Sequence, residues 1–222
     1  MNTLIAVARA LSGLNASPVF LAAGAVAAYF VGCLSPASVM GRIHGIDVRR
    51  EGSGNPGTTN VLRTMGKKAA AFTLAVDVLK GFVAVKISYG ALFLSTGDAE
   101  GAMLYSFICG MAALAGHAWP LPYRFAGGKG VATVLGVIFA LEPRVGAIVV
   151  AVDIAVLLAT RRVSAGSICA AAAFPVVSWF FDPMYAPFAL LTAAAVIGKH
   201  RGNIGRLLRG EEPKLSFGAK KS

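Results

Sequence analysis

Acidic residues, and charged residues in general, are scarce in this chain. Of its 222 residues, 10 are Asp or Glu and 21 are Lys or Arg, so that charged residues make up only 14% of the total. A soluble domain carries roughly 25% charged residues, and this chain therefore has too little charge to cover a globule with an ordinary polar surface. The scarcity argues against a soluble fold.

Cysteine is also scarce, and its spacing argues against a metal site. Cys33, Cys109 and Cys169 are odd in number, far apart and surrounded by apolar residues, which matches no metal-binding pattern. We expect these side chains to be small buried hydrophobes, and we expect no metal and no cofactor. The N-terminus lacks a strongly basic region, so no cleaved signal peptide is expected.

Hydrophobic residues, in contrast, make up 56% of the chain and come in long blocks. A bilayer core of about 30 Å needs roughly 20 helical residues to cross it, and about 17 at the low end. The blocks predict an all-α integral membrane protein, a bundle of seven transmembrane helices of which several are short. The expected spans cover about residues 18–40, 69–94, 101–116, 131–141, 145–160, 164–181 and 184–198. The fourth is so short that five spans with re-entrant pieces remain an alternative.

The basic residues lie between the apolar blocks and on alternate sides of them. They gather in segments 41–68, 117–130, 161–162 and 199–222, and the intervening segments are acidic or nearly neutral. The positive-inside rule places the basic segments in the cytoplasm, with the N-terminus outside and the C-terminus cytoplasmic. The net charge of +11 forms no stripe with interleaved aromatic residues, so no nucleic-acid partner is expected.

The pattern predicts one transmembrane domain, flanked by two short segments. Residues 18–212 form the expected domain, residues 1–17 an N-terminal extension, and residues 213–222 a basic tail. Within the second span, Asp77 and Lys80 are three residues apart and share a helix face, so they can pair. Whether that pair is structural or part of a site stays open at this point. Asp153 lies in the fifth span and has no assigned partner.

The first polar segment reads Gly52-Ser53-Gly54-Asn55-Pro56-Gly57-Thr58-Thr59-Asn60, with Arg63 just beyond it. Glycines let backbone N–H groups approach an anion closely. Hydroxyl and amide side chains and an arginine at helical spacing suit a phosphate. An ordinary flexible loop is the alternative, since Gly, Asn and Pro punctuate turns in any protein.

The second polar segment runs from His117 to Thr133 and contains Phe125-Ala126-Gly127-Gly128-Lys129-Gly130. A glycine-rich turn that carries a lysine and opens onto a helix predicts an anion site, because the helix N-terminus offers free N–H groups. The segment lacks the Walker A spacing, so an NTPase is not expected. His117 by itself is typical of a hydrogen-bonding residue at a helix end.

The third polar segment reads Lys199-His200-Arg201-Gly202-Asn203-Ile204-Gly205-Arg206-Leu207-Leu208-Arg209-Gly210-Glu211-Glu212. His200, Asn203 and Arg206 share one face if the segment is helical. A basic tail attracted to anionic lipid is the alternative. All three segments fall on the same side of the predicted membrane topology. Their convergence predicts a pocket for phosphorylated substrates, which a lipid tail would enter from the bilayer.

Together these strings resemble the motifs of the bacterial acyl-phosphate:glycerol-3-phosphate acyltransferases. The GSGNPGTTN, FAGGKGVAT and KHRGNIGRLL strings carry the resemblance, which covers about residues 31–212. Thr58 departs conservatively from the alanine that is typical of the family. The resemblance implies a seven-helix fold with an external N-terminus. It also implies an enzyme of the bacterial inner membrane that makes lysophosphatidic acid in phospholipid biosynthesis, with acyl phosphate as donor and glycerol 3-phosphate as acceptor.

The resemblance also implies which residues form the site. It assigns catalytic roles to Ser53, Arg63, Lys129, Ser167, His200 and Asn203. It assigns substrate binding to Gly54, Asn55, Asn60, Gly127, Gly128, Gly130 and Arg206. For Ser167, a lone serine in a membrane helix, the alternative to a role in the site is packing or a hydrogen bond to the backbone of its own helix. We expect a monomer that contacts membrane lipid and works on the cytoplasmic face.

The donor of such a reaction is already activated, so positioning and charge neutralisation could suffice for catalysis. None of the three histidines has an acidic residue five positions later, where Arg49, Pro122 and Gly205 stand, so a His-acid dyad is not expected. We expect direct transfer without an acyl-enzyme, with His200 as general base as a rival. The rival functions are a small membrane transporter of a phosphorylated metabolite and a structural membrane scaffold.

Overall fold

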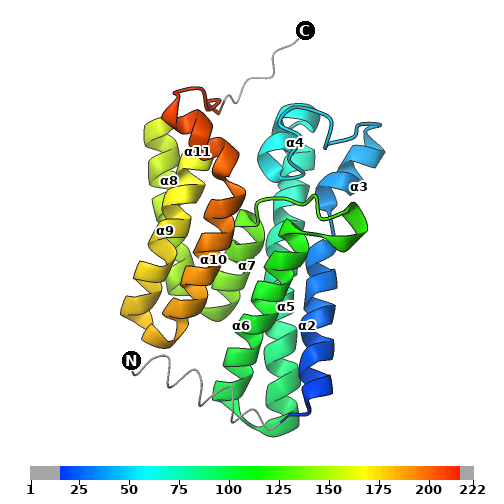
Figure 1. Cartoon of the computed structure of the whole chain (residues 1–222), viewed down its shortest axis with the longest axis vertical. Helices are drawn as coiled ribbons and strands as arrows, with labels where there is room; N and C mark the ends of the chain where they lie inside the picture. Colours follow the sequence, from blue (N-terminus) through cyan, green and yellow to red (C-terminus); the bar gives the residue numbers. More distant parts are fainter. Residues whose placement is uncertain (1–15, 216–222) are drawn as a thin grey trace.

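The computed structural model describes residues 16–215, and within them the protein is helical throughout, without a β-strand. The longer helices run side by side, and short helices lie at one end of the bundle (Figure 1). The elements in chain order are α2 (Pro18–Cys33), α3 (Pro36–Ile43), α4 (Thr58–Met65), α5 (Lys67–Thr96), α6 (Ala99–Ala118), η1 (Leu121–Tyr123), α7 (Val131–Leu141), α8 (Pro143–Thr160), α9 (Val163–Phe181), η2 (Pro183–Tyr185), α10 (Ala186–Lys199) and α11 (Arg201–Leu208).

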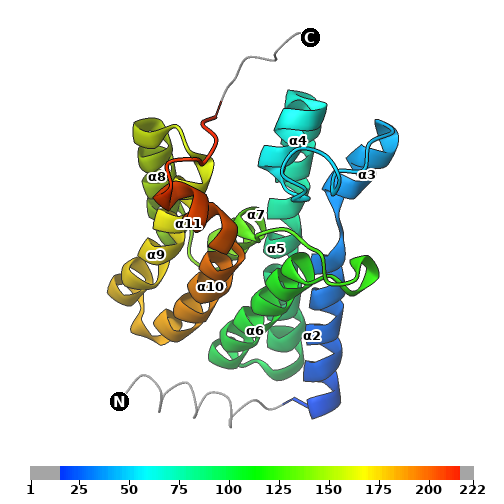
Figure 2. The same ribbon diagram turned by 45° about the horizontal axis from the view of Figure 1, so that its top comes forward.

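The long helices form two groups with α7 between them, as Figures 1 and 2 show. In the first group α2, α5 and α6 pack around a core that includes Leu92, Tyr105 and Cys109. In the second, α8, α9 and α10 pack with α7 around a core that includes Ile138 and Phe174. Helix α7 packs against α5 and α6 on one side and α8 on the other. It therefore joins the two groups.

Four helical stretches within the described residues are long and apolar enough to cross a membrane. They are Pro18–Ile43, Ala99–Tyr123, Pro143–Thr160 and Val163–Phe181. Helix α5 has 30 residues but carries charges along its length, and α7 and α10 are shorter. The membrane-protein class is confirmed in this form, while the number of seven spans stays a prediction.

The first predicted span is broken near its end. The sequence pattern predicted one helix over residues 18–40, but α2 ends at Cys33 and α3 begins at Pro36. Proline lacks a backbone N–H and disfavours helical geometry in the residue before it, and Ser35 accordingly has φ −114° and ψ 88°. The break frees the carbonyl of Leu34, which accepts a hydrogen bond from Lys80 Nζ at 2.9 Å.

Acidic residues cap the turns at the end of the bundle opposite α4 and α11. Asp98 accepts from the N–H of Gly101 at the start of α6, and Asp182 accepts from the N–H of Met184 in η2. Glu142 accepts from the N–H of Arg144 at the start of α8. A carboxylate at a helix N-terminus satisfies free N–H groups and favours the helix dipole. These caps explain the acidic character of this end.

Glycines allow two pairs of helices to approach closely. A methyl group at Gly32 of α2 would overlap the carbonyl of Ala113 in α6, and one at Gly136 of α7 would overlap the carbonyl of Val78 in α5. Gly81 of α5 is packed in the same way against α7. Small residues of this kind are what membrane helices use to pack closely, because burial from lipid gives no hydrophobic gain.

We expect the substitution Gly136→Ala to lower the free energy of unfolding by about 1–3 kcal/mol, the usual range for overpacking, because the added methyl group meets backbone atoms. Gly90→Ala is the matched control, since nothing lies within 4 Å of the added atom. Thermal unfolding of both variants in detergent would check this. Equal midpoints for Gly136→Ala and Gly90→Ala would contradict the close contact of α5 and α7.

Candidate functional site

The three polar segments lie at the same end of the bundle. Figure 1 shows α3, α4 and α11 at one end, with the segment that joins α6 to α7 crossing between them. Lys129 of the second segment interacts electrostatically with Arg63 of the first and with Arg206 and Glu212 of the third. Charges from all three segments therefore share one region, as the sequence predicted.

Asn60 organises the first segment from within. Its side-chain oxygen accepts a hydrogen bond from the N–H of Ser53 at 2.8 Å, and its side-chain nitrogen donates to the carbonyls of Val48 and Glu51 at 3.0 Å each. The residue is 1% exposed. Because its amide is engaged on both atoms, Asn60 shapes the loop and leaves direct contact with a ligand to its neighbours.

Those neighbours face outward. Ser53 and Arg63 are exposed, and Gly54 and Asn55 are half-buried. Gly54 has φ +69°, and an added side chain would also crowd the carbonyl of Arg49. Glycine adopts this left-handed backbone without the steric cost that other residues meet. The turn therefore leaves the Ser53 hydroxyl and the Arg63 guanidinium free on the surface of the site.

The loop from Trp119 to Gly130 is folded and not a flexible tether. Arg124 and Phe125 both have positive φ, at 53° and 62°, which is unusual for residues with a side chain. The N–H groups of Phe125 and Ala126 donate to the carbonyls of Pro120 and Tyr123 at 3.0 Å each. The surrounding bonds hold a strained backbone that ends at the N-terminus of α7.

Lys129 is half-buried at this N-terminus. The pKa of Lys129 is lowered to about 8, chiefly by burial and also by the cations Arg206 and Arg63, while Glu212 opposes the shift. Gly130, with φ +86°, is the N-cap residue just before α7. The free N–H groups of the first helical turn lie next to the lysine, so a cation and several donors point to one place, an arrangement suited to an anion.

Glu212 is the centre of the third segment, and sequence reasoning missed it. One carboxylate oxygen accepts from Ser164 Oγ and Asn203 Nδ2 at 2.6 Å each, and the other accepts from Arg206 Nε at 2.7 Å. Burial alone would raise the pKa of Glu212, but these three hydrogen bonds lower it below its ordinary value. The only signal in the sequence is an acidic residue at the end of a basic string.

His200 is buried between α10 and α11. Its Nδ1 lies 2.8 Å from the carbonyl oxygen of Val196, which requires the proton to be on Nδ1 and leaves Nε2 as an acceptor. Burial lowers the pKa of His200 to about 4, so the ring is neutral at pH 7. A neutral ring of this tautomer can accept a hydrogen bond from a hydroxyl group.

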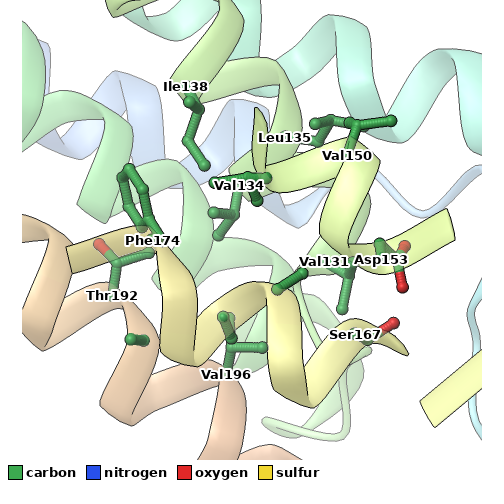
Figure 3. A pocket seen from close by; sticks show the side chains of 14 residues that line it. Val131, Val134, Leu135, Ile138, Val150, Asp153, Ser167, Phe174, Thr192 and Val196 are labelled. Carbon is green, nitrogen blue, oxygen red and sulfur yellow. The ribbon is translucent and has the colours of Figure 1, made fainter. Parts of the chain in front are cut away.

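An apolar groove lies next to this polar region, between α7, α8, α9 and α10. Ser167 lines it on α9 and Asp153 on α8, and Figure 3 shows the two side chains near each other. Phe174 and Ile138 line its far part. The groove thus has a polar end and an apolar interior, as an amphiphilic ligand requires.

A protein-family model described as glycerol-3-phosphate acyltransferase matches residues 22–210. The chain belongs to the glycerol-3-phosphate acyltransferase family. The resemblance of the three motif strings is thereby confirmed.

Curated relatives agree with this family. A protein of Thermoanaerobacter sp. (strain X514) named glycerol-3-phosphate acyltransferase is 42% identical over 194 residues, which are 86% of this chain and 93% of the relative. A protein of the same name from Clostridioides difficile (strain 630) is 43% identical over 193 residues, 86% of this chain and 93% of the relative. One from Laribacter hongkongensis (strain HLHK9) is 41% identical over 204 residues, 90% and 98% of the two chains.

Solved structures of a family member share the fold. The integral membrane glycerol 3-phosphate acyltransferase PlsY in its glycerol 3-phosphate form superposes with a TM-score of 0.79 at 34% identity, covering 89% of this chain and 95% of that one. The lysophosphatidic acid form gives 0.77 at 33% identity, covering 90% and 95%. Within the family fold, the described residues contain no group of three or more His, Cys, Asp or Glu side chains that could hold a metal ion.

We expect Glu212→Gln to destabilise the acyltransferase by about 2–3 kcal/mol, the worth of hydrogen bonds to a charged group, because Arg206 loses its anionic partner and Asn203 its strong acceptor. The loss should appear as a lower midpoint of thermal unfolding in detergent. Glu211→Gln is the matched control, since Glu211 is exposed and pairs only with exposed Arg209. The central role of Glu212 would be wrong if both variants unfolded at the same temperature.

Proposed function

We propose that the chain transfers a fatty acyl group from acyl phosphate to the C1 hydroxyl of glycerol 3-phosphate, which gives 1-acyl-glycerol 3-phosphate and phosphate at the start of phospholipid biosynthesis. The observation that carries this proposal is the cluster of cations from three segments beside the polar end of an apolar groove. The family, and solved relatives in glycerol 3-phosphate and lysophosphatidic acid forms, support it. A transporter is not favoured.

We further propose that seven helices lie in the bacterial inner membrane, with the N-terminus outside, the C-terminus in the cytoplasm and the site on the cytoplasmic face. The basic segments lie at the end of α4 and α11, and the acidic caps lie at the other end, which supports this orientation. Residues 18–212 act as the single catalytic domain of a monomer.

The acyl phosphate donor binds at the second segment. Lys129 neutralises its phosphate, and N–H groups of the first turn of α7, entered through Gly130, donate to it. Gly127 and Gly128 allow the loop to approach this position because any side chain on them would overlap His117. The acyl chain lies in the groove lined by α7 to α10, where burial of its methylene groups contributes roughly 0.8 kcal/mol each.

Glycerol 3-phosphate binds between the first and third segments. Arg63 and Arg206 neutralise its phosphate, while Ser53 and Asn55 donate to it. His200 accepts a hydrogen bond at Nε2 from the neighbouring C2 hydroxyl, which leaves the C1 proton free for transfer, and Asn203, held by Glu212, fixes the orientation of the glycerol. These groups hold the C1 oxygen against the carbonyl carbon of the donor. Holding two reactants in this geometry lowers the barrier of the reaction, because their translational and rotational entropy is lost on binding and not in the chemical step.

Direct transfer needs no acyl-enzyme. The C1 oxygen forms a bond to the carbonyl carbon, the bond from that carbon to the bridging oxygen breaks, and phosphate leaves with that oxygen. A phosphate oxygen of a substrate takes the hydroxyl proton. With a pKa of about 4, His200 is a weak base near neutral pH, and its role is to orient glycerol 3-phosphate. Ser167, at the polar end of the groove, contacts the head group of the donor. Lys129 stabilises the charge on the leaving phosphate.

We expect the purified protein, given palmitoyl phosphate and glycerol 3-phosphate in detergent, to release phosphate and form lysophosphatidic acid in equal amounts. Palmitoyl-CoA should give no product, and Lys129→Ala should lose about 100-fold or more in turnover, typical of a lost electrostatic donor. Both products are measured in the same reaction. Lys86→Ala, far from the loop on α5, is the control. Absence of product from a folded sample would refute the function, and glycerol 3-phosphate flux into proteoliposomes would then test transport.

We expect the rate to fall as the pH rises through about 8, because the lowered pKa of Lys129 means that the ammonium charge is present below this pH and lost above it. Lys129→Arg should remove this alkaline limb if it retains turnover, because arginine stays charged at every accessible pH. Initial rates from pH 6 to 10 would check this. An unchanged limb in Lys129→Arg would assign it to another group.

A further inference from the structure

A buried group of three ionisable side chains lies behind the loop that carries Lys129. Asp77 and Lys80 come from α5 and His117 from the last turn of α6, and their residues are 2%, 4% and 8% exposed. Lys80 Nζ lies 2.8 Å from Asp77 Oδ1, so the predicted pair forms. The same Nζ lies 2.7 Å from His117 Nδ1. None of these side chains is part of the mechanism proposed above.

Lys80 determines the tautomer of His117. An ammonium group has three donors and no acceptor, and the three nearest acceptors are Asp77 Oδ1, His117 Nδ1 and the carbonyl of Leu34, at 2.7–2.9 Å. The hydrogen bonds of the ammonium are those to His117 Nδ1 and the Leu34 carbonyl, and its contact with Asp77 Oδ1 is an ion pair. Because the ammonium can only donate, it fixes the role of the ring nitrogen that it meets. Nδ1 of His117 must accept, so the proton of the neutral ring is on Nε2.

His117 in turn supports the glycines that precede Lys129. Its carbonyl accepts a hydrogen bond from the N–H of Gly128 at 3.1 Å. A methyl group at Gly127 would overlap that carbonyl, and one at Gly128 would overlap Nε2 of the ring. Both the backbone and the ring of His117 therefore lie directly against the loop.

Arg49 also holds this loop. Its Nε donates to the carbonyl of Ala126 at 3.4 Å, its Nη1 donates to Ser38 Oγ at 2.8 Å, and its guanidinium lies 4.3 Å from the centre of the Tyr123 ring. Arg49 and His117 line a common hollow with Asp77 and Lys80. The loop is thus held by two side chains, and His117 is the one in direct contact with the pair of Asp77 and Lys80.

We propose that His117, held by Lys80 and Asp77, is a positioning residue that acts through Gly127 and Gly128 to keep Lys129 aimed at the substrate anion. The inference rests on the proposed function. The pair of Asp77 and Lys80 binds the carbonyl of Leu34 at the break after α2 and also fixes His117. It thereby links α2, α5 and α6 to the loop of the site.

The test compares the full-length His117→Ala, His117→Asn and Ser106→Ala proteins with the wild type in detergent. Asparagine keeps an acceptor close to the position of Nδ1, while alanine removes both the acceptor and the ring. Ser106 is the matched control, because it is a buried polar residue of the same helix whose hydroxyl bonds only within that helix. Hydrogen exchange of peptides covering residues 119–130 is measured without substrate, and kcat, both KM values and the pH profile are measured with palmitoyl phosphate and glycerol 3-phosphate.

We expect His117→Ala to speed exchange in residues 119–130 more than elsewhere and to lower kcat/KM about 100-fold, the scale of a small misplacement. The alkaline limb of the pH profile should move upward, because a looser loop lets water reach Lys129. His117→Asn should restore part of kcat/KM, and Ser106→Ala should match the wild type.

Two results would overturn the inference. One is a His117→Ala protein whose exchange rises evenly over all helices while its pH profile stays in place, since the cluster would then support only the bundle. The other is a His117→Asn protein no better than His117→Ala. Hydrogen exchange is measured without substrate, so it tests the contact between His117 and the loop independently of catalysis. If the wild type transferred no acyl group but His117→Ala still exchanged faster in residues 119–130, the proposed function would be refuted and the contact would stand.

Discussion

The short length of helix α7 is the constraint on which the position of the site depends. Its 11 residues span about 16 Å at 1.5 Å per residue, so the helix is much shorter than its neighbours α5, α6 and α8. Those three helices pack around it. The close contact at Gly136 fixes α7 against α5. Lys129 at its N-terminus is thereby recessed below the ends of the longer helices, beside the groove.

Two buried charged residues, Glu212 and Lys80, hold the polar groups near this helix end. Glu212 binds the side chains of Ser164, Asn203 and Arg206, and Lys80 binds those of Asp77 and His117 and the carbonyl of Leu34. A buried charge is costly unless every partner is in place, so each of the two residues admits few arrangements of its neighbours. The cations that face the substrates are therefore held before any substrate arrives, which is the condition for electrostatic stabilisation of a transition state.

The arrangement fits a reaction whose donor is already activated. In the reaction that we propose, the groove takes the acyl chain of the donor and the cations take its phosphate, so the reacting carbonyl lies at the boundary between them. The three basic, glycine-rich segments gather at one end of the bundle, and the other end carries the capping residues Asp98, Glu142 and Asp182. A transporter needs access from both sides of the midplane, whereas an enzyme that joins a water-soluble acceptor to a lipid needs this one boundary.

The sequence by itself determined the membrane class, the one-sided distribution of basic segments and the family, because apolar blocks, charge order and motif strings are local properties that need no contact to be recognised. Only the tertiary structure decided the break at Pro36, the inward turn of the Asn60 amide and the central place of Glu212. The partners of such groups lie far apart in the chain, as Ser164 and Glu212 do. Which of these groups meet depends on the rotation of each helix about its axis and on its crossing angle with its neighbours. Hydrophobic periodicity gives little information on either in helices that are apolar on nearly every face.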